Sequence, residues 1–331
     1  IITNLRGGNN PPLYEIILHC WIKAFGIYPV SVRFPSLIFS LITIYFTYKT
    51  VVRISTSHTA VLSILFLSLS NYYIYFTHEA RAYSLFLMLS VISVYLMIRI
   101  SDNKALKITD FIFLGLIASL MIYSHYFGVF VLIFQSFYFI FINLGKRSVI
   151  NKYLILCACV FIIYSPYISV MYSRFIDSAQ NGTWVNPTEN LGNLHDIIFW
   201  FSNKNRIVYV IILSLFYGSL LKLSNRLEIS SIVKNLLCYI LIPLFFLTSL
   251  SIFNSLPFIW RLTEMKVYTF IFVTITSLIF IFTLIHYQKK YGHQLFIIGS
   301  FLMPLILFFS VSFLIPIWVD RYLIFILPSF Y

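Results

Sequence analysis

Long apolar runs follow one another along most of the chain, and short polar segments separate them. A helix that crosses a bilayer needs about 20 mainly apolar residues, and roughly 17 at the least. By this rule the pattern predicts about ten complete transmembrane helices and a truncated one that begins near residue 322. The complete helices are expected at 34–52, 59–76, 84–98, 109–124, 127–144, 153–171, 207–223, 235–253, 267–285 and 294–315.

Residues 13–25 predict a helix of another kind. Apolar residues recur in it at helical spacing, whereas Glu15, His19 and Lys23 recur every four residues along one face. The segment is too short and too polar to span a bilayer, so we expect an amphipathic helix in the membrane interface, ended by Gly26.

The composition is that of an integral membrane protein. Of the 331 residues, 60% are hydrophobic and only 10% are charged, and the mean hydropathy is +0.91. Soluble chains are about 45–50% apolar and about 25% charged. The net charge of +13 raises the question of nucleic acid, but the basic residues lie in short loops between apolar runs, where they orient helices and meet lipid headgroups. We therefore expect an all-α, polytopic helical bundle with membrane lipids, and no nucleic acid, as partners.

The basic residues also predict the orientation of the helices. Cytoplasmic loops carry an excess of Lys and Arg, which assigns to the cytoplasm 49–58, 99–108, 145–152, 222–234 and 286–293. The extracytoplasmic side then holds 1–33, 78–83, 125–126, 172–206, 254–266 and 320–322. Most acidic residues gather on that side, namely Glu15, Glu79, Asp177, Glu189, Asp196, Glu264 and Asp320. This segregation indicates a polar site there.

One transmembrane domain over residues 1–331 accommodates these elements, with 1–33 and 172–206 as its longer extracytoplasmic segments. The apolar stretch 197–201 predicts a short interfacial helix, either covering a cavity or merely resting on the membrane. The chain begins without Met and stops inside an apolar run, so a first span and a C-terminal part are expected to be missing.

The apolar pattern breaks most sharply at His78-Glu79-Ala80-Arg81-Ala82-Tyr83. A Glu and an Arg two residues apart are costly inside hydrocarbon, so we expect them at a helix junction, at an interface or in a wet cavity. Ionisable residues in such a place are candidates for a functional site.

Several motifs together resemble a known family. In chain order they are Asn10-Pro11-Pro12-Leu13-Tyr14, Arg33-Phe34-Pro35-Ser36-Leu37, the segment His78 to Tyr83, Ser124-His125-Tyr126-Phe127, and Asp320-Arg321-Tyr322-Leu323 with Pro328. Their types and order are similar to those of polytopic GT-C glycosyltransferases. That group includes lipid A aminoarabinose transferases, protein O-mannosyltransferases and the rhizobial lipopolysaccharide sugar transferases.

The resemblance implies a GT-C-type bundle that moves a mannose-like sugar, or another hexose or pentose, from a polyprenyl-phosphate donor to a lipid, glycan or protein acceptor. It implies a bacterial or archaeal cell membrane, with the site facing outward. Many members carry His or Lys where this chain has Asn10, and their catalytic acidic pair corresponds to residues upstream of Ile1. The alternatives are a flippase or transporter of lipid-linked glycans and a polysaccharide polymerase.

The residues themselves suit this chemistry. No nucleotide-sugar pool exists outside the cytoplasm, so an activated sugar must arrive on a lipid, and its phosphate leaving group needs cations. The candidates for binding the donor phosphate are Arg81, Arg321, Arg33 and Asn10. Glu79 is expected to support catalysis, while the base itself is expected upstream of Ile1.

The remaining site candidates are Tyr83, His78, His125, Tyr126, Asp320, Tyr322 and Glu15. A divalent cation held by Glu79, His78 or His125 is compatible with the sequence, but no ligand spacing requires one. Structural alternatives stay open throughout. Glu79 and Arg81 would then fix two helix ends, the motifs at 125–126 and 320–322 would be interfacial anchors, and Glu15 would lie on the wet face of its helix.

Overall fold

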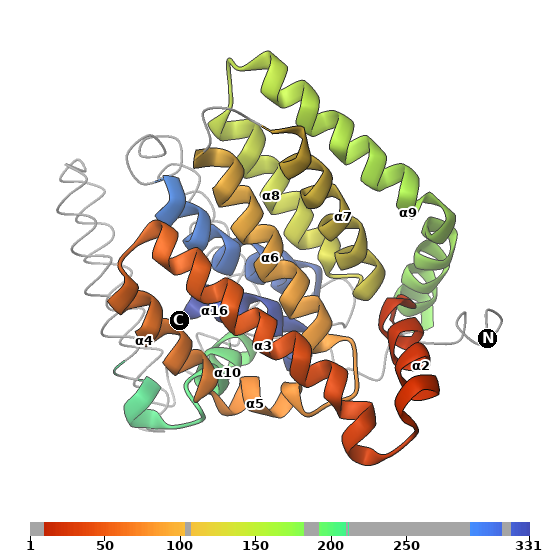
Figure 1. The fold of residues 1–331 in the computed structure, drawn as a ribbon, viewed down its shortest axis with the longest axis vertical. Helices are drawn as coiled ribbons and strands as arrows, with labels where there is room; N and C mark the ends of the chain where they lie inside the picture. Colours follow the sequence, from red (N-terminus) through yellow and green to blue (C-terminus); the bar gives the residue numbers. More distant parts are fainter. Residues whose placement is uncertain (1–9, 103–106, 182–191, 210, 212–291, 313–318) are drawn as a thin grey trace. The chain divides into compact units, whose positions relative to one another are not determined.

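The computed structural model describes residues 10–102, 107–181, 192–209, 211, 292–312 and 319–331 (Figure 1). Every regular element within these ranges is helical, which confirms the predicted all-α class. The chain forms two compact units. One comprises Ile1–Leu69, Tyr73–Pro187 and Gln288–Tyr331, and the other comprises Ser70–Tyr72 and Thr188–Tyr287. The prediction of a single domain over the whole chain stays a prediction.

The predicted interfacial helix is α2, and it runs from Leu13 to Phe25 as expected. Gly26 ends the helix with φ +80°, a conformation that residues with a side chain rarely adopt. Tyr14 is the buried residue of this helix, and it faces the first long helix of the bundle, α3 (Pro29–Ile54).

Helix α3 buries small residues, most of them serines and threonines, and exposes several of its large apolar ones. Its buried positions are Pro35, Ser36, Ser40, Thr43, Thr47 and Thr50, whereas Leu37, Leu41 and Tyr45 are exposed. Small residues let helices approach closely in a bilayer, where burying leucines gains nothing over leaving them in lipid. This distribution is therefore the one expected of a helix with a lipid-facing outer surface.

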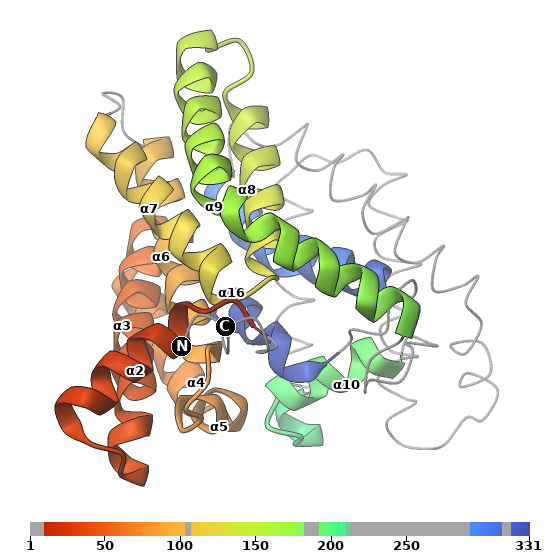
Figure 2. The same ribbon diagram turned by 90° about the vertical axis from the view of Figure 1, so that its right-hand side faces the viewer.

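Helix α3 packs against α6 (Tyr83–Asp102), and α6 packs in turn against α7 (Ile108–Ser124) (Figure 1). Helix α7 contacts both α8 (Gly128–Ile142) and α9 (Arg147–Asn181) (Figure 2). The chain thus leaves one end of the bundle in α6, returns in α7 and leaves again in α8. The basic residues Arg99, Lys107 and Lys146 lie at the far ends of these helices, which is the arrangement predicted from the loop charges.

The expected helix over 59–76 is not straight. It consists of α4 (Ser57–Ser68) and α5 (Asn71–Thr77), which are bent by 65° at the break. The helical hydrogen bonds stop there, and the backbone N–H of Asn71 donates instead to Oδ1 of Asn203, at 2.6 Å. A side-chain acceptor from another segment thus begins a new helix.

The short helix predicted over 197–201 is confirmed, because α10 (Gly192–Phe201) contains that stretch. Helix α9 (Arg147–Asn181) is longer than the span expected over 153–171 and continues to Asn181. Helix α9 also changes direction along its length, and Pro166 lies inside it (Figure 1). The run expected to begin a truncated span near 322 starts as a 3-10 helix, η2 (Asp320–Ile326), followed by the short α16 (Leu327–Phe330).

Within the described ranges, four helices are long and apolar enough to cross a membrane: Pro29–Ile54, Tyr83–Ser101, Arg147–Arg174 and Gly292–Ser312. The bent pair α4 and α5 makes a fifth if it counts as one span, and α7 and α8 are shorter apolar helices. The spans expected at 207–223, 235–253 and 267–285 lie outside the described residues. A multi-pass membrane protein is thus confirmed, whereas the count of about ten spans stays a prediction.

Candidate active site

The charged segment at 78–83 is a turn between two helices, which is one of the three placements expected for it. Helix α5 ends at Thr77 and α6 begins at Tyr83. Nδ1 of His78 lies 2.7 Å from the carbonyl oxygen of Ile74, so this imidazole donates to the last turn of α5. A donor in that position satisfies a carbonyl that the ending helix leaves unpaired. In this structure His78 therefore caps the end of α5, and its role as a site residue stays a prediction.

A chain of hydrogen bonds ties the turn to α2 and α3. The hydroxyl of Ser36 donates to the backbone carbonyl of Glu79 at 2.7 Å, and the hydroxyl of Tyr14 lies 3.0 Å from Ser36 Oγ. Tyr14 and Ser36 are both buried. The first three motifs along the chain therefore meet at one point.

The other end of the turn belongs to a ring cluster, which consists of Tyr83, Phe86, His125, Phe127 and Tyr322. His125 lies at its centre. The imidazole stacks on Phe86 with the ring centroids 5.0 Å apart and contacts the edge of Tyr322 at 5.1 Å. Tyr83 lies 6.4 Å from Tyr322. The ring cluster thus joins the third motif to the fourth, which connects α7 and α8, and to the fifth, in η2.

His125 is a buried, neutral histidine. Burial is the main cause that lowers its pKa to about 3, and the positive charge of Arg321 lowers it further. Its Nδ1 accepts the backbone N–H of Phe127 at 3.3 Å, so the ring proton is on Nε2. Nε2 is buried and has no hydrogen-bond partner among the described residues.

Two arginines border the ring cluster. The guanidinium of Arg81 hydrogen-bonds the phenol of Tyr83, and its pKa is raised by that bond and by the nearby charge of Glu79. Arg321 lies 5.7 Å from the ring centre of Tyr322, and its charge acts on both Tyr83 and His125. The Oε2 atom of Glu79 is buried without a partner in the described part of the chain. Arg81 and Arg321, from segments far apart in the sequence, therefore lie beside the same rings, and the charge of Glu79 acts on Arg81.

The structure does not join every candidate to this cluster. Arg33 is exposed on α3, and in the described ranges no hydrogen bond or ion pair links Arg33 or Asn10 to the ring cluster. Glu15 is exposed on α2, the position expected from the wet-face alternative. Tyr126 points elsewhere, because its hydroxyl lies 3.5 Å from that of Tyr167 on α9. Asp320 is half-buried at the start of η2, next to Arg321.

Sequence reasoning missed Ser36 and Phe86 as site residues. Ser36 belongs to a motif that was singled out, but no sequence pattern shows that its hydroxyl reaches Glu79 across 43 positions. Phe86 lies three residues after Tyr83 on α6. Residues at this spacing lie on the same face of a helix, and this spacing could have indicated that Phe86 belongs to the site. As for metals, no group of three or more His, Cys, Asp or Glu residues in the described ranges is placed to hold an ion.

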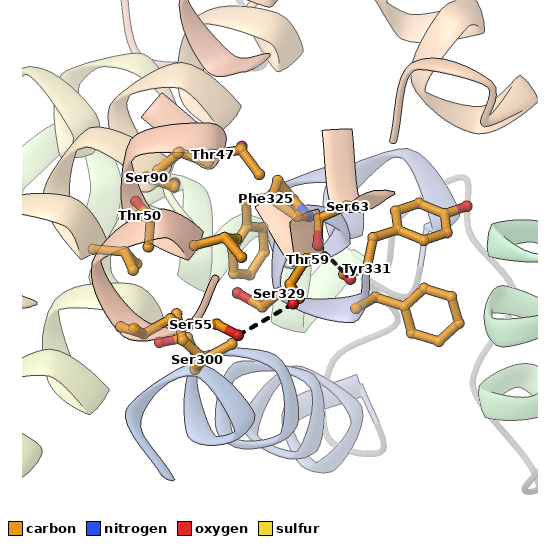
Figure 3. A pocket seen from close by; sticks show the side chains of 17 residues that line it. Thr47, Thr50, Ser55, Thr59, Ser63, Ser90, Ser300, Phe325, Ser329 and Tyr331 are labelled. Carbon is orange, nitrogen blue, oxygen red and sulfur yellow. Dashed lines mark hydrogen bonds between the residues drawn. The ribbon is translucent and has the colours of Figure 1, made fainter. Parts of the chain in front are cut away.

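Two cavities lie apart from the ring cluster. An apolar groove of about 530 Å³ runs between α7, α8 and α9, and Ile122 and Val129 line it a few residues from His125. A smaller cavity of about 240 Å³ is lined by hydroxyl-bearing residues of α3, α4, α6 and the C-terminal segment (Figure 3). Thr47, Thr50 and Ser63 belong to this hydroxyl-lined cavity, which lies further along α3 than Ser36.

A protein-family model matches part of the chain. The family model described as dolichyl-phosphate-mannose-protein mannosyltransferase matches residues 9–169. The matched range contains the first four motifs and the helices α2 to α8. No curated protein and no solved structure matches the chain.

Proposed function

We propose that the ring cluster is the site of sugar transfer from a polyprenyl-phosphate donor, because residues 9–169 match the model of the dolichyl-phosphate-mannose-protein mannosyltransferase family, a family of membrane glycosyltransferases. The sugar is mannose or a close relative, and the acceptor is a protein, lipid or glycan on the same side of the membrane. One observation carries the proposal: Arg81 and Arg321, from motifs about 240 positions apart, border the same group of rings.

Two arginines in this arrangement suit the leaving group of the reaction. When the sugar departs to the acceptor, negative charge develops on the lipid phosphate, and fixed cations lower the energy of that state. The guanidinium fork matches phosphate oxygens and keeps its charge at any physiological pH. In this proposal Arg81 and Arg321 bind the phosphate from two sides, and Tyr83 holds Arg81 in place through its hydrogen bond.

Neutral His125 adds a donor without adding charge. Its Nε2–H is buried and has no partner among the described residues. The imidazole contacts both Tyr83 and Tyr322, the two tyrosines next to Arg81 and Arg321. A neutral donor is compatible with two neighbouring cations, whereas an imidazolium would be repelled by Arg321. We assign His125 to hydrogen bonding of a donor oxygen.

Glu79 has a supporting role in the proposal. Its charge acts on Arg81, and its carbonyl is held by Ser36, so its contribution is to orient the guanidinium rather than to accept the acceptor's proton. The apolar groove between α7, α8 and α9 offers the lipid tail an environment like the bilayer interior. Its lining residues Ile122 and Val129 flank the segment that carries His125.

The experiment compares two donors with the full-length protein in vesicles. Radiolabelled mannose is supplied either on polyprenyl phosphate or on a nucleotide, and both the labelled acceptor and the released polyprenyl phosphate are measured. We expect transfer from the lipid donor, with one polyprenyl phosphate released for each sugar transferred. Transfer from the nucleotide donor alone, or movement of the lipid donor across the vesicle without any bond being made, would overturn the proposal.

A further inference from the structure

The hydroxyl of Ser36 has only one proton, which fixes the direction of the hydrogen bonds that meet there. That proton goes to the carbonyl oxygen of Glu79, at 2.7 Å, because a carbonyl can only accept. The contact of 3.0 Å between Tyr14 and Ser36 must then be a bond that Tyr14 donates. Burial raises the pKa of the Tyr14 phenol, so this donor keeps its proton. The order is therefore Tyr14 to Ser36 to Glu79.

Both hydroxyl-bearing residues of this relay are buried, and Glu79, where it ends, is half-buried. Ser36 has no exposed surface, and Tyr14 is 2% exposed. Successive hydrogen bonds polarise one another and are stronger in a medium of low dielectric than in water. The bond to Glu79 also ends in backbone, so it fixes the course of the turn and not merely one side chain.

The position of the relay gives it a functional consequence. It holds the carbonyl of Glu79, two residues before Arg81, whereas Arg81 itself is held at the other end by Tyr83. The turn between α5 and α6 is thus fastened on both sides of Arg81. Helix α2 and helix α3, neither of which contributes a ring to the ring cluster, set the place of the turn through Tyr14 and Ser36.

We propose that Ser36 is a positioning residue for sugar transfer, and that Tyr14 acts through it to hold the Glu79–Arg81 turn in the geometry that the reaction needs. The inference rests on the proposed function, and it adds residues that do not touch the substrate. Displacement of a reacting or charge-stabilising group by about 1 Å costs on the order of a hundredfold in rate. Loss of the relay therefore lowers kcat and leaves the KM for the lipid donor nearly unchanged.

The test compares Ser36→Ala, Ser36→Thr and Tyr14→Phe in the full-length protein. We expect a fall in kcat of roughly tenfold to a hundredfold for Ser36→Ala and a smaller one for Tyr14→Phe, which keeps the bond to Glu79. Ser36→Thr restores most of the turnover because it retains the hydroxyl. The double variant loses no more than Ser36→Ala alone, because Tyr14 acts only through Ser36.

The matched control is Thr50→Val. Thr50 is a buried residue of the same helix, and its hydroxyl bonds within α3 to the carbonyl of Phe46 at 2.7 Å. A fall in kcat equal to that of Ser36→Ala would make the effect one of helix stability and would overturn the proposal. Unchanged kcat in Ser36→Ala would overturn it as well.

A second measurement keeps this proposal apart from the proposed function. Amide hydrogen exchange of the peptide containing residues 78–82 reports the turn directly, whether or not the protein transfers sugar. We expect faster exchange there in Ser36→Ala and no change in Thr50→Val. If the wild-type protein transfers no sugar, the proposed function fails. If Ser36→Ala leaves the exchange of residues 78–82 unchanged, the relay is refuted, whatever the outcome for sugar transfer.

Discussion

The buried state of His125 predicts a specific dependence of stability on pH. The pKa of this imidazole is lowered from 6.5 to about 3 in the folded protein, by burial first and by Arg321 second. Tyr83 and Tyr322, the other titratable groups facing it, contact its ring. On unfolding the imidazole returns to its ordinary pKa and takes up a proton below about pH 6.5. The free energy of unfolding is therefore unaffected by the titration of His125 above that pH, and it decreases as the pH falls from 6.5 toward 3.

The size of the effect follows from these two pKa values. Between pH 7 and pH 5 the folded imidazole stays neutral, whereas the unfolded one changes from mostly neutral to almost fully protonated. Integrating the difference in bound protons gives a loss of about 2 kcal/mol in the free energy of unfolding. The figure is insensitive to the exact folded pKa as long as that pKa stays well below 5.

The assay is equilibrium unfolding in mixed detergent micelles at pH 7 and pH 5, with His125→Phe as the comparison. Phenylalanine retains the stacking on Phe86 and cannot titrate. The other histidines contribute equally to both proteins, so the difference in pH dependence isolates His125. We expect wild type to lose about 2 kcal/mol more than the variant on acidification. Equal losses would refute the assignment of His125 as a buried neutral group.

Two further predictions concern stability. Thr47 Oγ1 is buried and has no partner in the described residues, so Thr47→Val should be neutral or stabilise by up to about 1 kcal/mol, whereas Thr50→Val should cost about 1 kcal/mol in the same unfolding assay. A larger loss at Thr47 than at Thr50 would contradict this accounting. Arg99 pairs at 3.1 Å with Asp110, whose side chain is only 5% exposed, so Arg99→Met should cost about 1–3 kcal/mol. Adding Asp110→Asn should recover most of that loss, and a double-mutant cycle without recovery would count against the pair.

The sequence was most informative where structure is local. The bounds of α2 follow from side-chain spacing and from Gly26, and the junction at 78–83 follows from the cost of Glu79 and Arg81 in hydrocarbon. The charge bias of the loops also placed His78 to Tyr83, His125 and Tyr322 at one end of the bundle, where the rings do meet. Which side of the membrane that end faces stays a prediction.

Features that depend on contacts between distant segments were not predictable. At the bend between α4 and α5, the backbone N–H of Asn71 donates to Asn203, a residue from another part of the chain. The role of Ser36 depends on its reaching Glu79 across 43 positions. The tail beginning at Asp320 is apolar enough for an α-helix, yet it starts as a 3-10 helix, a choice that hydrophobic pattern does not encode. The exposed position of Arg33 on α3 was not visible in the sequence, and its role in phosphate binding stays a prediction.

The most direct test of the central claim is the turnover of Arg81→Ala in the full-length protein, with sugar transferred from a polyprenyl-phosphate donor as the readout. The control is Arg147→Ala, which removes an exposed arginine at the start of α9. If Arg81 stabilises the departing phosphate, its loss should lower kcat by about a hundredfold while the protein stays folded in the membrane, and the control should transfer at the wild-type rate. Wild-type turnover in Arg81→Ala would contradict the account.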